Sequence, residues 1–359
     1  MASLILYCAL FGGFVLISVA GQHKISYRDP LIFYEGRWDE SPGTWWAGSG
    51  LKLHVANLQT LSINLGEATS APVAPLGVSV GSGPFFTYNA TAGENLIDLG
   101  DIQKTTSTIV RINVQGHSNN HIVLESITLN LGATLLPYKP QSKITFQFIG
   151  DSFSSGYLLP MGINQGWTFL VGENYKAEYR VTAQPGAALT DIYSYGNVNG
   201  MTKQFFLTED TGFYYTTFHN YTTPWKFERD QPSPTHVVIH LGANDAAQGV
   251  TDDEFVQVYL EFLVKVRKLY PTQPIFMLTP WGWPNEDGSV YYYYPGLYQK
   301  IFSERRAIGD LNIYIVDATG WVTYPDVFAD NKHPNANGQI KIANNFISFL
   351  QGWGLKMPV

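Results

Sequence analysis

A single cysteine, Cys8, occurs in the 359 residues, and charged residues make up only 14% of the chain. One cysteine can form neither a disulfide within the chain nor a multi-thiolate metal site, so small disulfide-stabilised folds and cysteine-based zinc sites are excluded. Positive charge is also scarce, because 22 Lys and Arg stand against 29 Asp and Glu, a formal net charge of −7. This balance argues against nucleic acid and anionic membrane surfaces as partners and favours neutral substrates.

Hydrophobic residues are plentiful, at 45% of the chain, and aromatic residues reach 14%. A chain of this length and composition is globular and can build two cores. Most of the aromatic rings are expected in those cores, although aromatic faces are also what sugar rings stack on.

Residues 4–19 form an apolar stretch without charge, and Ser18-Val19-Ala20 ends it with small residues of the kind that a signal peptidase accepts. We therefore expect a signal peptide over residues 1–21, a secreted extracellular protein and no stable membrane association after cleavage. An uncleaved anchor is the alternative, but the stretch is shorter than the roughly 20 residues of a membrane span. Two sequons, at Asn89 and Asn220, are compatible with N-glycosylation of a secreted protein.

The chain changes its hydrophobic pattern near residue 140. Before that point, short alternating segments such as 58–65 and 108–114 are separated by Gly, Pro, Asn and Ser, which predicts an antiparallel β-sandwich over residues 22–135. Residues 136–142 carry two prolines and polar residues, the composition of a linker. We place the boundary of a second domain, residues 143–359, directly after it.

The second domain alternates short apolar runs with segments long enough for helices. The runs lie at residues 144–149, 236–241, 274–278 and 313–316. A capping box at Thr251 to Glu254 opens one amphipathic helix, and helical spacing predicts another over residues 336–350. This alternation indicates an α/β fold, a parallel sheet flanked by helices, in which ligands bind at the carboxyl ends of the strands.

Three short blocks fall in loops at such positions: Gly150-Asp151-Ser152, Gly242-Ala243-Asn244-Asp245 and Asp330-Asn331-Lys332-His333. Ser152 is a candidate nucleophile, His333 the base that activates it, and Asp330 the acid that orients the imidazole. The side-chain amide of Asn244, with the backbone N–H groups of Ser152 and Gly186, could hold the oxyanion. No G-x-S-x-G elbow surrounds Ser152, which argues against the α/β-hydrolase superfamily.

Each of these residues also has a plainer interpretation. Ser152 could be a turn residue that caps a helix, and Asp330 could cap the turn before the last helix. The histidines outside the third block show no ligand spacing, so we expect no metal site and no cofactor. Trp281 and Trp283 follow the run at residues 274–278 and could line a sugar cleft, although packing is nearly as favoured.

Together the blocks resemble those of the SGNH (GDSL) hydrolases, in the same order, with Gly186 in Gln184-Pro185-Gly186-Ala187 as the second block. Gly196 or Gly200 could be argued instead of Gly186. The resemblance implies a flavodoxin-like domain with the catalytic residues Ser152, Asp330 and His333 and the oxyanion hole Ser152, Gly186 and Asn244.

The segments Gly36-Arg37-Trp38-Asp39, Trp46-Ala47-Gly48-Ser49 and 121–125 resemble the jelly-roll-like β-sandwich domain that precedes the SGNH domain in carbohydrate esterase family 2. This second resemblance implies removal of acetyl groups from plant-cell-wall polysaccharide. We also expect the protein to be a monomer. Some members of that family lack the triad acid, whereas this chain has Asp330 at the matching place.

The sequence therefore predicts a secreted serine esterase that removes acetyl groups from xylan or mannan through an acyl-enzyme. A lipid or aryl esterase on the same scaffold is one alternative. A carbohydrate-binding protein without enzymatic activity is the other, and an intact nucleophile, base and oxyanion amide argue against it.

Overall fold

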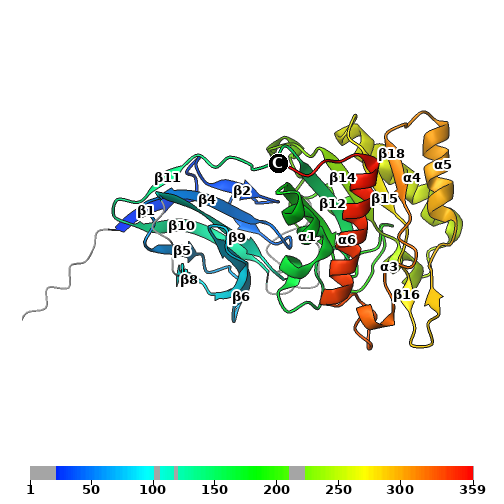
Figure 1. Ribbon diagram of the computed structural model, residues 1–359, viewed down its shortest axis with the longest axis horizontal. Helices are drawn as coiled ribbons and strands as arrows, with labels where there is room; N and C mark the ends of the chain where they lie inside the picture. The colour runs from blue at the N-terminus through cyan, green and yellow to red at the C-terminus, as the bar shows by residue number, and fades with distance from the viewer. Residues whose placement is uncertain (1–21, 101–105, 117–119, 210–222, 359) are drawn as a thin grey trace, which may run out of the picture.

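The computed structural model describes residues 22–100, 106–116, 120–209 and 223–358 (Figure 1). The predicted signal segment with Cys8 and the sequon at Asn220 lie outside these residues. Asn89 is described and is an exposed residue of an edge strand. Within the described ranges, no helix has the length and apolar character that a membrane crossing requires.

The first part of the chain consists of two antiparallel sheets that enclose a core of aliphatic residues. One sheet has the order β1-β10-β5-β8, with β3 paired to β10, and the other has the order β11-β4-β9-β6-β7, with β2 paired to β4. The strands are β1 Gln22–Ser26, β2 Phe33–Glu35, β3 Gly43–Thr44, β4 Gly50–Ala56, β5 Leu61–Leu65, β6 Ala74–Val80, β7 Phe86–Ala90, β8 Gly93–Leu96, β9 Ser107–Val114, β10 Ile122–Asn130 and β11 Thr134–Leu136. The predicted antiparallel sandwich is confirmed.

The second part is built on a parallel sheet with the order β13-β12-β14-β15-β18. Its strands are β12 Thr145–Asp151, β13 Glu178–Gln184, β14 His236–His240, β15 Ile275–Leu278 and β18 Ile313–Val316. The other elements are α1 Trp167–Asn174, α2 Met201–Gln204, α3 Ala243–Ala247, α4 Asp252–Leu269, α5 Leu297–Ala307, α6 Ala336–Trp353, a hairpin of β16 Trp283–Pro284 and β17 Val290–Tyr291, and the 3-10 turns η1 Gly162–Gln165, η2 Phe227–Arg229 and η3 Tyr324–Asp326. The predicted α/β fold with a parallel sheet is confirmed.

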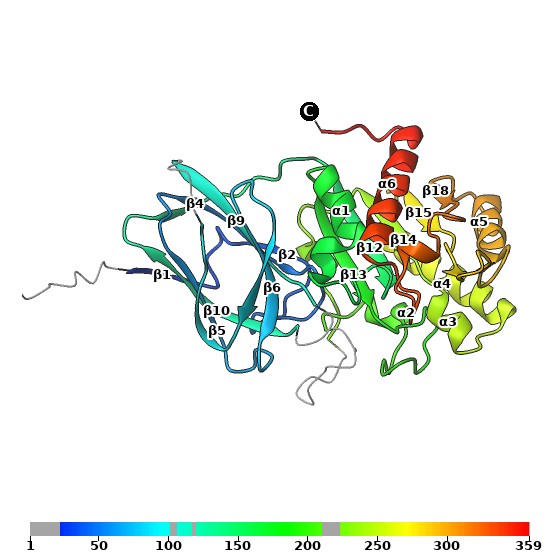
Figure 2. The same ribbon diagram turned by 60° about the horizontal axis from the view of Figure 1, so that its bottom comes forward.

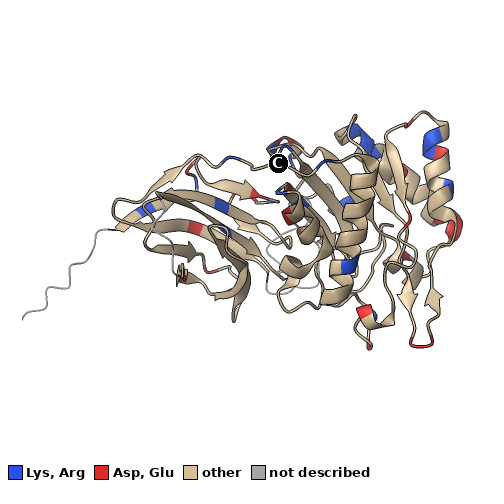
Figure 3. Cartoon of the chain, in the orientation of Figure 1, with Lys and Arg blue, Asp and Glu red and all other residues tan. Residues whose placement is uncertain are grey.

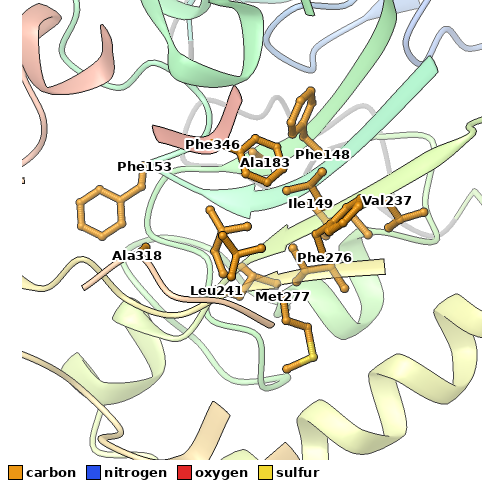
Figure 4. Packing of buried hydrophobic residues seen from close by; sticks show 14 of the residues in the cluster. Phe148, Ile149, Phe153, Ala183, Val237, Leu241, Phe276, Met277, Ala318 and Phe346 are labelled. Atoms are coloured by element: carbon orange, nitrogen blue, oxygen red, sulfur yellow. The ribbon is translucent and has the colours of Figure 1, made fainter. Parts of the chain in front are cut away.

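Helices cover both faces of this sheet, α1 and α6 on one and α4 and α5 on the other (Figures 1 and 2). Large apolar side chains of the central strands fill the space between the layers, as Figure 4 shows for Phe148, Phe276 and Met277. Thr251 caps α4 by accepting the Glu254 N–H. Acidic residues in the first turn of α4 and basic residues in its last turn also suit the helix dipole.

The sandwich packs against β13, the edge strand of the parallel sheet. Arg37 reaches from the sandwich into the second part, where its guanidinium donates to the carbonyls of Leu207 at 2.5 Å and Phe205 at 2.6 Å. Lys52 lies between two carboxylates, Glu35 of the sandwich at 3.2 Å and Glu178 of β13 at 2.5 Å. These charged groups are nearly inaccessible to solvent, so the two parts form one packed unit.

Candidate active site

Ser152 and His333 meet although 181 positions separate them in the chain. Ser152 follows directly on β12, at the carboxyl end of the parallel sheet. Its Oγ lies 2.9 Å from His333 Nε2, within hydrogen-bonding distance. A neutral imidazole that accepts this bond at Nε2 is placed to take the serine proton, so the pair has the geometry of a nucleophile and its base.

His333 lies in a loop that its own backbone closes. The Phe328 N–H donates to the His333 carbonyl at 2.9 Å, and the Lys332 N–H donates to the Phe328 carbonyl at 2.7 Å. Lys332 adopts a φ of 58°, in the left-handed region. Immediately after the loop, Asn335 caps α6 by accepting the N–H groups of Asn337 and Gly338. The imidazole therefore projects from a fixed turn at the start of the last helix.

The group that faces the other imidazole nitrogen is an amide. Asn331 Oδ1 lies 3.2 Å from His333 Nδ1 and also accepts the His333 backbone N–H at 2.9 Å. Asp330, the acid predicted from the sequence to orient the imidazole directly, instead accepts a 3.0 Å hydrogen bond from Asn331 Nδ2. The structure thus differs from the expectation, because the turn at Lys332 brings Asn331 back onto His333 and leaves the Asp330 side chain exposed.

Asn244 lies in the first turn of α3, beside Ser152. Its Nδ2 donates to the Ala187 carbonyl at 2.9 Å and, over a longer 3.4 Å, to Asp151 Oδ2. Two features of Gly242, the residue before α3, favour glycine at this position. Its φ is 124°, and a Cβ there would come within 2.2 Å of the Tyr298 hydroxyl. The Gly-Ala-Asn block is therefore a close-approach turn that places Asn244 in the pocket lined by Ser152.

Gly186 follows β13 and lines the same pocket as Ser152 and Asn244. It has a φ of 77°, and a Cβ at this position would lie 2.6 Å from the Cβ of Tyr195. Of the three glycines considered from the sequence, Gly186 is the one among the described pocket residues. Gly186 thus lines the pocket together with Asn244, and the oxyanion role of Ser152, Gly186 and Asn244 stays a prediction.

Two buried carboxylates, Asp151 and Asp245, lie next to the site and hold its loops. Asp151 accepts the Phe153 N–H at 3.0 Å, and burial, with Asp245 nearby, raises the pKa of Asp151 to about 7. Asp245 accepts the N–H groups of Leu189 at 2.8 Å and Thr190 at 2.9 Å, and burial raises its pKa as well. Both side chains hold loops in place and lie away from the open pocket.

The pocket has a volume of about 460 Å³ and opens to solvent. Besides the catalytic candidates, its described lining comprises Tyr157, Gln184, Pro185, Tyr195, Ala243, Ala247, Trp283 and Asn331. Trp283 packs edge-on to His333, with ring centroids 5.8 Å apart, and Tyr195 is 59% exposed. Tyr195 was not expected from the sequence, and the only signal for it was its closeness in sequence to Gly186.

Trp281 has a different environment from Trp283. It is 1% exposed and stacks on His240 with ring centroids 4.0 Å apart. A buried indole cannot offer a face to a sugar, so the substrate-binding prediction for Trp281 is wrong. Trp283, two residues later on strand β16, is the tryptophan that reaches the pocket. Among the described residues, no cluster of three or more His, Cys, Asp or Glu has a metal-binding arrangement.

Residues 148–340, which include all three blocks, match the sequence profile of the GDSL-like lipase/acylhydrolase family. No curated protein matches the chain. Among solved structures, the chain is similar to a family two carbohydrate esterase from Cellvibrio japonicus, with a TM-score of 0.73 and 15% identity over 92% of this chain and 98% of that one. It is also similar to a family two carbohydrate esterase from Clostridium thermocellum in complex with cellohexaose, with a TM-score of 0.70 and 19% identity over 90% and 98%. An acetyl xylan esterase, Est2A, from the rumen bacterium Butyrivibrio proteoclasticus gives a TM-score of 0.72 and 15% identity over 93% and 99%. The likeness covers the sandwich as well as the parallel sheet.

Proposed function

The chain belongs to the GDSL-like lipase/acylhydrolase family, and from this premise we propose that it is a secreted serine esterase that removes acetyl groups from plant-cell-wall polysaccharide of the xylan or mannan type. The observation that carries the proposal is the 2.9 Å contact between Ser152 Oγ and His333 Nε2 inside an open pocket lined by aromatic and amide side chains.

In the proposed reaction, Ser152 Oγ bonds to the carbonyl carbon of the acetyl ester while its proton passes to His333 Nε2. The negative charge that develops on the carbonyl oxygen is held by Asn244 Nδ2 and by the backbone N–H groups of Ser152 and Gly186. The proton on Nε2 then moves to the sugar oxygen, which leaves as an alcohol. A water molecule repeats these steps on the acetyl-serine and releases acetate.

The lining of the pocket supports a neutral, sugar-like substrate. The described residues around it include no Asp, Glu, Lys or Arg, and its aromatic rings, Tyr157, Tyr195 and Trp283, come from three separate segments of the chain. The side-chain amide of Gln184 adds hydrogen-bonding groups of the kind that sugar hydroxyls use. In the view of Figure 3, the positions of basic and acidic residues are interspersed along the described part of the chain.

The resemblance to family two carbohydrate esterases adds support for the acetyl specificity. The similar structures described above include an acetyl xylan esterase and an esterase holding cellohexaose. Secretion is supported by the apolar stretch at residues 4–19 and by the sequon at the exposed Asn89. N-terminal sequencing of the protein recovered from culture medium tests the secretion step.

Acetate release from acetylated xylan, acetylated mannan and an acetylated polymer without sugar rings tests the substrate class. We expect release from at least one of the polysaccharides and none above background from the Ser152→Ala variant. Acetate release by the Ser152→Ala variant at a rate comparable to that of the wild type would contradict the serine mechanism.

A lipid esterase on the same scaffold is the rival function. It would need an apolar channel for a long acyl chain, whereas the apolar aliphatic part of the described lining is limited to Pro185, Ala243 and Ala247. Comparing acetyl with octanoyl nitrophenyl esters separates the two, and a preference for the octanoyl ester would favour the lipid esterase.

A further inference from the structure

The imidazole of His333 is oriented by a two-step hydrogen-bonded chain. Asn331 Oδ1 lies 3.2 Å from Nδ1, and the amide nitrogen of the same side chain donates to Asp330 Oδ1 at 3.0 Å. A carboxylate can only accept, so Nδ2 must face Asp330. The His333 backbone N–H can only donate, so Oδ1 must face His333, at 2.9 Å. Two independent partners therefore fix which end of the amide meets the imidazole.

We propose that Asn331 is the positioning residue of His333 and that Asp330 acts on the imidazole through the Asn331 amide. The proposal rests on the serine-esterase function above and specifies how its base is held. With Oδ1 as the acceptor, the proton of the neutral imidazole lies on Nδ1, and Nε2 is left with the lone pair that Ser152 needs.

Aromatic rings and charged side chains surround the His333 imidazole. The rings of Phe153, Tyr157 and Trp283 pack around the imidazole and limit its rotation. The charged neighbours in the loop are Asp330 and Lys332, and the Lys332 ammonium donates to Asn285 Oδ1 in the β16–β17 turn. The amide accepts the Nδ1 proton without a full negative charge, so it stabilises the imidazolium less than a directly bonded carboxylate does.

Four variants test this arrangement: Asn331→Ala, Asn331→Asp, Asp330→Asn and the double variant with Asn331→Ala and Asp330→Asn. We expect Asn331→Ala to lower kcat on a small aryl acetate by ~10²-fold, because the base loses its orientation. Asn331→Asp should restore most of that loss and shift the acid limb of the kcat/KM profile upward by about one pH unit, because a carboxylate then faces the imidazole.

Asp330→Asn keeps an acceptor for Asn331 and removes only the charge, so its effect on kcat should be less than ~10-fold. In the Asn331→Ala background, Asp330→Asn should have no further effect, because the connecting amide is gone. If Asn331→Ala stays within threefold of wild type while Asp330→Asn loses ~10²-fold or more, Asp330 orients the imidazole directly and the proposal is overturned. A further large loss in the double variant would overturn it as well.

A measurement without substrate separates this proposal from the proposed function. NMR titration of the His333 ring, assigned with His333→Gln, should show a pKa raised by Asn331→Asp and lowered by Asn331→Ala. A protein without esterase activity would refute the proposed function and still permit this test. A His333 pKa that is equal in all Asn331 variants would refute the positioning role even in an active esterase.

Discussion

At the scale of single residues, Asn244 has two hydrogen bonds of unequal strength. The bond to the Ala187 carbonyl is 2.9 Å long and fixes the amide, whereas the one to Asp151 is 3.4 Å long. An oxyanion in the pocket would replace the weaker bond, so the contribution of Asn244 should be larger in the transition state than with bound substrate. We expect Asn244→Ala to lower kcat by ~10²–10³-fold with little change in KM.

Steady-state kinetics on an aryl acetate, with a thermal unfolding curve for each variant, checks this prediction. Ser155→Ala, at a buried serine near the nucleophile, serves as the matched control and should keep most of its activity. A large rise in KM at constant kcat would make Asn244 a contact to the ground-state substrate.

The residues of the site differ in how far sequence alone could predict them. Ser152, Asn244 and His333 stand in short blocks whose glycines and polar residues are needed at fixed offsets, so the blocks could be found without a structure. Asn331 and Tyr195 could not, because their roles depend on backbone turns. Lys332 and Tyr195 both have positive φ, at 58° and 44°, in residues for which the sequence gives no hint of a left-handed turn.

At the scale of elements, the hairpin of β16 and β17 separates two neighbouring tryptophans. Trp283 lines the pocket, whereas Trp281 is buried against His240. If Trp283 stacks on a sugar ring, Trp283→Ala should reduce deacetylation of oligosaccharides much more than hydrolysis of a small aryl acetate.

Trp281→Ala is the matched control for this comparison. It should lower activity on both substrates equally, and it should lower stability by about 3–5 kcal/mol, because it leaves a cavity. Equal losses on both substrates in Trp283→Ala would point to a packing role for that residue too.

Strand β14 carries a histidine whose burial favours the neutral imidazole over the imidazolium. Burial lowers the pKa of His240 to about 3, and neither of its ring nitrogens has a hydrogen-bond partner among the described residues. Between pH 6.5 and about 3, His240 binds a second ring proton in the unfolded chain but not in the folded chain. The free energy of unfolding therefore falls as the pH falls. His240→Phe should remove up to about 1.4 kcal/mol per pH unit from that decline.

Unfolding free energies from urea titrations at several pH values measure this slope. The difference between the two proteins should be constant above pH 8, where the histidine is neutral in both states. An unchanged slope below pH 6 would mean that His240 is protonated in the folded protein.

Strand β13 was not predicted, and its composition explains why. Glu178 and Arg180 interrupt the apolar pattern, and sequence analysis assigns such residues to the surface. In the structure both are buried, because Glu178 pairs with Lys52 of the sandwich at 2.5 Å and Arg180 pairs with Asp230 at 3.3 Å. Central strands with continuous apolar runs were predictable, whereas an edge strand completed by another part of the chain was not.

At the scale of the whole molecule, Arg37 connects the sandwich to the α/β part. Its guanidinium satisfies the carbonyls of Leu207, Phe205 and Gln204, and lies over the rings of Trp46 and Trp225. Arg37→Ala should lower the free energy of unfolding by about 2 kcal/mol or more, because buried carbonyls lose their donors. Arg28→Ala, at an exposed arginine of the same sandwich, should have an effect within about 0.5 kcal/mol.

Calorimetry of both variants checks this prediction, and Arg37→Ala should also broaden or split the transition if the two parts unfold separately. An Arg37→Ala protein as stable as Arg28→Ala would show that the contacts of Arg37 contribute nothing to the interface.

The buried ion pair of Lys52 with Glu178 links the sandwich to an edge strand of the parallel sheet. Glu178 begins the strand whose far end leads into Gly186, so the sandwich supports an edge that ends in the pocket. Cutting the gene between residues 136 and 142 would leave a carboxylate of the catalytic half without its counter-ion on newly exposed apolar surface. We therefore expect the α/β part to be unstable when it is produced alone or fused to another protein. A stable catalytic unit needs the sandwich as well as the α/β part.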